Sequence, residues 1–187
     1  MGQCFEAHWA DINNDGTKEI LASCYDTRKG NETGNFFVYE QNWSNPSQPW
    51  KRSAIASGFI ANSYLFGNSM TPGKSRLFWP SEEYKNTPTE FAASPKPWIA
   101  LSGDDDGIHY ILFPRSEDPA DMEYELRVRY IASTEYSHPQ HMSQIMHDSE
   151  ATTSGTMAID DLDGDGFTEI ISAGYTAGEV YVYTFAP

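Results

Sequence analysis

Two nine-residue segments of this chain place oxygen-bearing side chains at the spacing that a calcium ion requires. The first runs from Asp11 to Glu19 with the pattern D-x-N-x-D-G-x-x-E, and the second runs from Asp161 to Glu169 with the pattern D-x-D-x-D-G-x-x-E. Calcium takes about six to eight oxygen ligands, and alternating positions turn short oxygen side chains toward one centre. The glycine at the sixth position permits the sharp turn. We therefore expect one Ca²⁺ in each segment.

The expected ligands occupy equivalent positions in the two segments. Positions one, three, five and nine offer side-chain oxygens, and position seven offers its backbone carbonyl. In the first loop these ligands are Asp11, Asn13, Asp15, Thr17 and Glu19. In the second loop they are Asp161, Asp163, Asp165, Phe167 and Glu169. An EF-hand would carry its closing acid at position twelve and lie between helices. Here apolar, strand-like residues follow position nine at once, so the pattern differs from an EF-hand.

A longer internal repeat predicts the elements that hold these loops. Residues 9–21 align with residues 159–171, and the agreement continues from 34–39 to 178–183. A degenerate copy at 97–113 keeps two strands and the tight turn between them but lacks the calcium spacing. Each unit therefore reads as a strand, a loop, a second strand, a hairpin tip and a third strand.

A fourth strand is expected in the first two units. Residues 50–57 and 124–131 alternate large apolar with charged side chains, which is typical of an edge strand that faces solvent. The segment from Pro80 to Pro97, rich in Pro, Ser and Thr, is predicted to be a long loop that replaces the metal site in the middle unit.

Four antiparallel strands per unit are typical of a β-propeller blade. We expect an all-β chain with a single propeller region over 1–187 and about three blades, approximately 3–59, 60–133 and 134–187. Closed propellers have about 4–8 blades. We therefore expect either a fragment of a larger propeller or a chain whose ring is completed by further blades from the same or another chain.

The two loops, the Glu-Ile-Leu and Glu-Ile-Ile segments that follow them, and the strands at 34–39 and 178–183 resemble the FG-GAP or VCBS repeats. Such repeats occur in the propellers of integrin α-subunits, in fungal propeller lectins and in many secreted proteins. The resemblance covers the first and third units well and the middle unit only through its hairpin. It implies that calcium has a structural role at both sites, and that no metal is expected in the middle unit.

Composition narrows the class of partner. The formal net charge of −15 argues against nucleic acid, because a phosphate backbone needs basic side chains. No apolar run approaches the ~20 residues of a membrane span.

No signal peptide is visible at the N-terminus, which we expect to be truncated. Two sequons, at Asn31 and Asn42, favour an extracellular, glycosylated protein. Cys4 and Cys24 are either a disulfide pair or two small buried side chains.

His138, His141 and His147 lie close together in the sequence and form a possible second site for zinc or acid–base chemistry, although their spacing matches no zinc signature. A solvated loop is the competing interpretation. The sequence contains no recognisable catalytic triad or phosphate loop, which favours a binding or structural module for a protein or glycan ligand over an enzyme. A lectin is one alternative, and the propeller part of a sugar-acting dehydratase or lyase is another.

Overall fold

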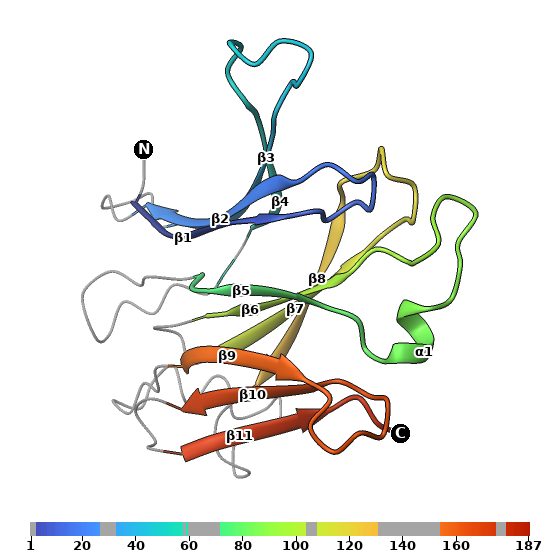
Figure 1. Cartoon of the computed structure of the whole chain (residues 1–187). Coiled ribbons are helices and arrows are strands. Elements are labelled where there is room, and N and C mark those ends of the chain that lie inside the picture. Colours follow the sequence, from blue (N-terminus) through green and yellow to red (C-terminus); the bar gives the residue numbers. More distant parts are fainter. Residues whose placement is uncertain are drawn as a thin grey trace.

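The computed structural model describes residues 3–26, 33–57, 59, 72–103, 108–130, 154–174 and 179–187. Within them the chain forms eleven β-strands and one short helix, arranged as three antiparallel sheets that follow one another along the sequence (Figure 1). The first sheet contains β1 (Gln3–Ala10), β2 (Glu19–Asp26), β3 (Thr33–Glu40) and β4 (Lys51–Ser57). The second contains β5 (Ser75–Phe78), β6 (Trp98–Ser102), β7 (Ile108–Pro114) and β8 (Tyr124–Tyr130). The third contains β9 (Ser154–Asp160), β10 (Glu169–Gly174) and β11 (Glu179–Thr184).

The expected all-β class is confirmed, and so is the antiparallel pairing of consecutive strands within each unit. In the first two sheets the strand order is the sequence order, which places β4 and β8 at the sheet edges as their alternating pattern predicts. The described part of the third sheet has three strands in the order β11-β10-β9. The turn at 104–107 lies outside the described residues.

The segment between β5 and β6 differs in one respect from the expected irregular loop. It contains a single helical turn, α1 (Glu82–Lys85). Ser81 caps this turn, because its hydroxyl accepts a hydrogen bond from the backbone N–H of Tyr84 at 3.1 Å. A serine followed by two acids is a recognisable start signal for a helix, so the sequence did contain this information.

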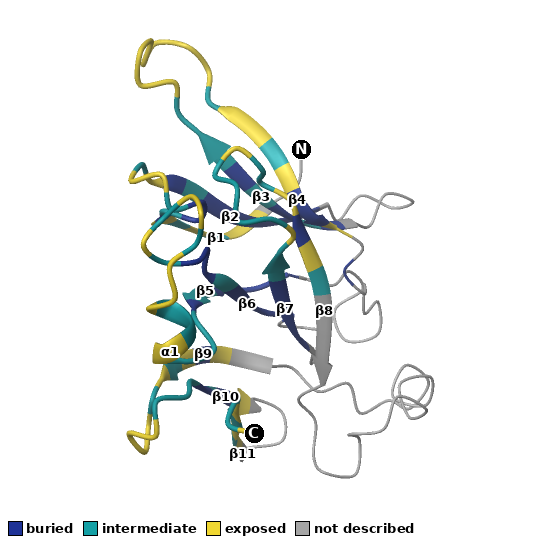
Figure 2. Cartoon of the chain, turned by 90° about the vertical axis from the view of Figure 1, so that its right-hand side faces the viewer, coloured by how far each residue is buried: buried dark blue, intermediate teal, exposed yellow. Residues whose placement is uncertain are grey.

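The sheets stack face to face, with one cluster of buried side chains between each neighbouring pair. The first cluster joins Leu21, Phe36 and Val38 of the first sheet to residues such as Ile99 and Leu112 of the second. Figure 2 shows the buried residues concentrated in the interior strands β2, β3, β6 and β7. Burial of these apolar faces is the main force that holds the sheets together.

The second cluster joins the other face of the second sheet to the third sheet. It is formed by Ala100, Ile111, Met157 and Ile170, with Trp98 packed against it. The Trp98 ring lies edge-on to that of Phe113, with the ring centroids 4.0 Å apart. The second sheet is therefore covered on both faces, and the stack has the first and third sheets on its outside.

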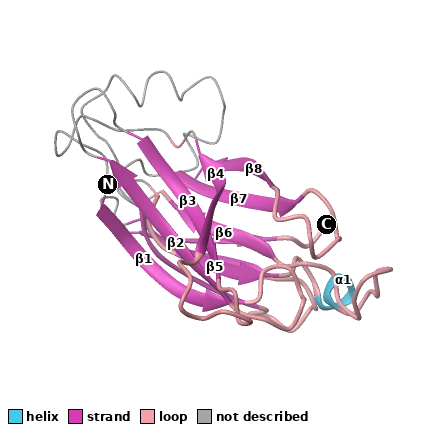
Figure 3. Ribbon diagram, turned by 90° about the horizontal axis from the view of Figure 1, so that it is seen from above, coloured by secondary structure: helices cyan, strands magenta, loops and turns pink. Residues whose placement is uncertain are grey.

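The connections β1–β2, β5–β6 and β9–β10 all emerge at the same side of the stack, where α1 lies (Figures 1 and 3). Each follows the first strand of its sheet, so the three connections occupy the same position in the strand order of the three sheets. Among the described residues no helix has both the length and the apolar character that a membrane crossing demands.

Candidate metal centres in the two acidic loops

The two acidic loops have the same backbone shape. In both, the fourth and sixth positions take positive φ angles, at Asn14 (58°) and Gly16 (83°) in the first loop and at Gly164 (77°) and Gly166 (88°) in the second. Glycine and asparagine are the residues that adopt this left-handed region most readily. The sequence therefore fixes these turns locally.

Four hydrogen bonds recur at equivalent positions of the two loops. The N–H of Gly16 donates to Asp11 Oδ2, and that of Gly166 donates to Asp161 Oδ2, both at 3.0 Å. The N–H groups at positions five and seven likewise donate to the side chains at positions three and five in both loops. These bonds hold the side chains at positions one, three and five around one centre, as a cation site requires.

The fourth shared bond fixes the closing acid. The N–H of Ile12 donates to Glu19 Oε2 at 3.2 Å, and the N–H of Leu162 donates to Glu169 Oε2 at 2.9 Å. Both glutamates are buried at the start of a strand. Each therefore presents its carboxylate to the inside of its loop and away from bulk water.

The first loop carries an electrostatic cost in the absence of a cation. Burial raises the pKa of the Glu19 carboxyl to about 7; the hydrogen bond from Ile12 opposes this change, and the charges of Asp15 and Asp11 add to it. In addition, Oδ1 of Asp11 is buried and has no hydrogen-bond partner among the described residues. A buried carboxylate oxygen without a partner is unfavourable, and a bound cation would satisfy it.

The loops differ at position three. The amide of Asn13 donates from Nδ2 to Asp15 Oδ2 at 3.1 Å and to the carbonyl of Pro119 at 3.0 Å. The second loop has Asp163 at this position, which when ionised has no N–H to offer. One oxygen each from Asp161, Asp163 and Glu169 lie within 4.8 Å of one another. The second loop thus concentrates more negative charge than the first.

Both loops are attached to the middle unit. In the first, Nδ2 of Asn14 donates to the carbonyls of Pro95 at 2.7 Å and Ser94 at 3.0 Å. In the second, the N–H of Glu82 donates to the carbonyl of Gly166 at 2.9 Å. The long segment between β5 and β6 therefore touches both acidic loops, and a change in loop shape would be transmitted to it.

Lys96, two residues before the start of β6, is a buried polar residue that the sequence did not indicate. Its side chain is buried, and its ammonium group donates to the backbone carbonyls of Ser116 (2.8 Å), Asp121 (2.6 Å) and Asp118. Burial lowers the pKa of this ammonium, while nearby Asp121, Glu117 and Asp118 raise it. The middle unit thus holds a buried side-chain amine bonded to backbone carbonyls of the connection between β7 and β8. No spacing signal marks a lone lysine for this role.

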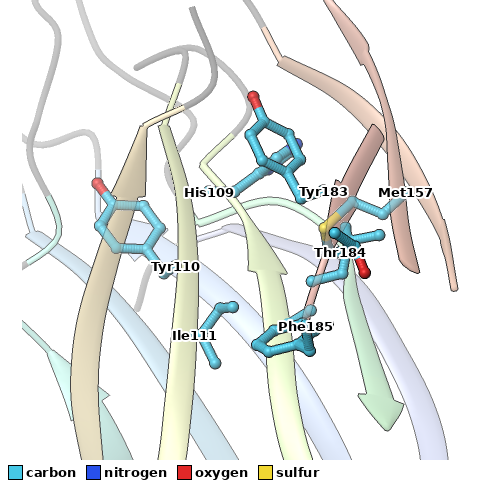
Figure 4. Close-up of a pocket in the computed structure, with 9 residues that line it drawn as sticks. His109, Tyr110, Ile111, Met157, Tyr183, Thr184 and Phe185 are labelled. Carbon is cyan, nitrogen blue, oxygen red and sulfur yellow. The ribbon is translucent and has the colours of Figure 1, made fainter. Parts of the chain in front are cut away.

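His109 and Ser172 form a second arrangement that the sequence did not indicate. Nε2 of His109 on β7 is hydrogen-bonded to the hydroxyl of Ser172 on β10, and both side chains are buried. His109 also lines a cavity of about 110 Å³ between the second and third sheets, whose other walls include Met157 and Phe185 (Figure 4). Burial lowers the pKa of His109 to about 3, so the ring stays neutral at physiological pH.

Of the remaining predicted residues, the structure describes Cys4, Cys24 and Asn42. Cys4 and Cys24 face each other across β1 and β2 and form a disulfide, which resolves the alternative left open by the sequence. Asn42 is exposed in the connection between β3 and β4, where its side chain accepts hydrogen bonds from the N–H groups of Ser44 and Asn45. Asn31, His138, His141 and His147 lie outside the described residues.

Comparisons of the chain with family models, curated proteins and solved structures found no match.

Proposed function

We propose that each acidic loop binds one Ca²⁺ and that the chain is a calcium-stabilised extracellular β-propeller module whose three sheets are blades. The observation that carries this proposal is the set of four hydrogen bonds shared by the two loops. They hold oxygen-bearing side chains at equivalent positions in two places that are 150 residues apart, from Asp11 to Asp161. Such repetition is expected of a metal site and not of an incidental acidic turn.

The position of the loops supports a structural role for the ion. Each loop joins the first two strands of a sheet and is also bonded to the middle unit. A cation that neutralises a loop would therefore stabilise both a strand connection and a contact between sheets. The disulfide between Cys4 and Cys24 and the exposed sequon at Asn42 support an extracellular location. In this role the chain is a binding or structural module for a protein or glycan ligand.

The test is a calcium titration by calorimetry of the chelator-treated protein, together with melting curves in Ca²⁺ and in chelator. We expect two ions per chain and a higher Tm in Ca²⁺, because an ion that binds only the folded state stabilises it by mass action. At a free concentration 100 times Kd the gain is about 2.7 kcal/mol per site. Magnesium at the same concentration serves as the control for ionic strength.

Variants separate specific coordination from general charge. Asp163→Ala should reduce the stoichiometry from two ions to one, because it removes a ligand at position three. Asp160→Ala is the matched control, since this exposed acid lies immediately before the second loop and is not a predicted ligand. Two unchanged sites in Asp163→Ala, or an equal loss in both variants, would count against the proposal.

A further inference from the structure

The stack of sheets ends in two apolar faces that contribute nothing to the two buried clusters. We call the face of the first sheet that points away from the second sheet the front face. Its apolar side chains include Ala7, Trp9, Ile20, Ala22, Phe37 and Tyr39, and the guanidinium of Arg52 lies 4.8 Å from the centroid of the Phe37 ring. We call the face of the third sheet that points away from the second sheet the rear face. Its apolar side chains include Ala158, Ile171, Ala173, Val180 and Val182, and the polar Asp160 and Thr184 lie on the same face. Strand alternation fixes both assignments, because the neighbours of these residues point into the clusters.

We propose that the front face of one chain docks on the rear face of a second copy, and that two copies close into one ring of six sheets. This inference concerns the faces of the sheets and does not depend on calcium binding. It adds a partner to the proposed module, namely a second copy of this chain.

The internal repeat indicates what fits the front face. Ile20 and Tyr39 of the first sheet align with Ile170 and Tyr183 of the third. Ile170 and Tyr183 pack against the second sheet, in the cluster that joins the two sheets. The front face of the first sheet therefore corresponds to the face of the third sheet that the second sheet covers. Trp9, by contrast, is 52% exposed.

The same argument applies to the rear face, and here the contrast in exposure is larger. Val182 aligns with Val38, and Val180 aligns with Phe36. Val38 and Phe36 are fully buried against the second sheet, whereas Val182 is 56% exposed and Val180 is 68% exposed. Val180 and Val182 are thus exposed apolar side chains on one face of the third sheet, where a docked sheet would cover them.

The two faces are complementary in size. The front face carries three aromatic rings, whereas the apolar side chains of the rear face are alanine, valine and isoleucine. In the contact between sheets two and three, aromatic rings come from both sides, with Trp98 of the second sheet packed against Phe185 that follows β11.

Closure of the ring follows from the head-to-tail contact between front and rear faces. Front and rear are different surfaces, so docking is head-to-tail and continues until a ring closes. Two chains of three sheets give six, which lies within the range of about 4–8 sheets found in closed rings. Like-charge repulsion between chains of net charge −15 opposes association. We therefore expect higher salt to strengthen the dimer, because it screens the repulsion and leaves the apolar contact intact.

Light scattering after size exclusion tests the proposal on the full chain. We expect a mass of 42.0 kDa, twice the 21.0 kDa of one chain. Val182→Glu should weaken the dimer at least ~100-fold, because docking would bury an unpaired carboxylate. Phe91→Glu is the matched control, since Phe91 is 47% exposed in the β5–β6 connection and belongs to neither face. Circular dichroism melts of each variant verify that the fold is retained.

A mixing experiment tests the head-to-tail arrangement. Ala7→Glu on the exposed front face should also give monomers. When Ala7→Glu and Val182→Glu are mixed, the intact rear face of the first can meet the intact front face of the second, so a heterodimer should form through a single contact. A wild-type monomer at all salt concentrations would overturn the proposal. So would a dimer that survives both single substitutions, or open-ended polymers in place of a 42.0 kDa species. Two bound calcium ions on a strict monomer would leave the proposed function standing and remove only this inference.

Discussion

The backbone N–H of Ile12 donates a hydrogen bond to the buried carboxylate of Glu19 across 3.2 Å. This contact closes the first acidic loop at the point where β2 begins, and Leu162 and Glu169 repeat it in the second loop. Glu19 thus belongs both to the loop and to the protein interior. Burial favours its protonated form, whereas the hydrogen bond from Ile12 favours its charged form.

The stability of the calcium-free protein should fall as the pH rises from about 4.5 to about 7, to the extent that Glu19 determines it. Burial raises the pKa of this carboxyl to about 7 in the folded state, from 4.5 in the unfolded chain. The folded state therefore binds the proton more tightly, and its advantage is lost as the proton leaves. Urea unfolding of wild type and Glu19→Gln in chelator at pH 5 and pH 8 measures this effect. The difference between the two proteins should change with pH; a constant difference would contradict the prediction.

Gly164→Ala should destabilise the folded protein by about 1 kcal/mol, because an L-residue at positive φ is strained. The backbone at Gly164 has φ of 77°, and no atom lies within 4 Å of an added Cβ, so the strain is the only cost. Gly164→Asn should lose less, since Asn14 occupies the equivalent position with φ of 58°. Denaturant unfolding of the two variants provides the comparison, and an equal loss in both would contradict this account.

Lys96→Met should destabilise the protein by about 3 kcal/mol, because it removes a buried charge-assisted network and leaves carbonyls without donors. The three carbonyls concerned belong to the 115–123 connection, which Lys96 ties to the start of β6. Lys85→Met is the matched control. Lys85 is paired with Glu82 at the surface, where such a pair contributes only about 0–1 kcal/mol. Thermal melts that show similar losses for the two variants would exclude the structural role of Lys96.

Ser172→Ala should cost about 1–3 kcal/mol, because it leaves Nε2 of the buried His109 without a partner. Ser23→Ala is the control, since the hydroxyl of this buried serine has no hydrogen-bond partner among the described residues. Its removal should be nearly neutral. Unfolding free energies of the two alanine variants, measured at pH 7, decide between a specific bond and a general intolerance of change at buried serines.

The same histidine should make the protein sensitive to acid. Burial lowers the pKa of His109 from 6.5 to about 3, so the unfolded state binds its proton more readily. Stability should therefore decrease as the pH falls from 6.5 toward 3. His109→Gln should abolish this part of the pH dependence in denaturant titrations. A pH profile identical to that of wild type would show that the ring does not titrate in this way.

Much of the fold could be predicted from the sequence because the relevant forces are local. Apolar and charged side chains alternate along β4 and β8, and that alternation predicts edge strands. The shape of each acidic loop is likewise determined within its own nine residues, since the shared hydrogen bonds span only two to seven positions. Gly16 and Gly166 supply the backbone freedom that these turns require.

Tertiary structure decided the features that join residues far apart in the chain. The bond between His109 and Ser172 spans 63 positions, and the bond between Asn14 and Pro95 spans 81. Such contacts depend on how separate sheets pack, and no local pattern distinguishes these residues from other serines, histidines or asparagines. The exposure of the front and rear faces likewise depends on how the sheets pack. Val38 and Val182 occupy equivalent places in the repeat, and only the position of their sheets in the stack makes one buried and the other exposed.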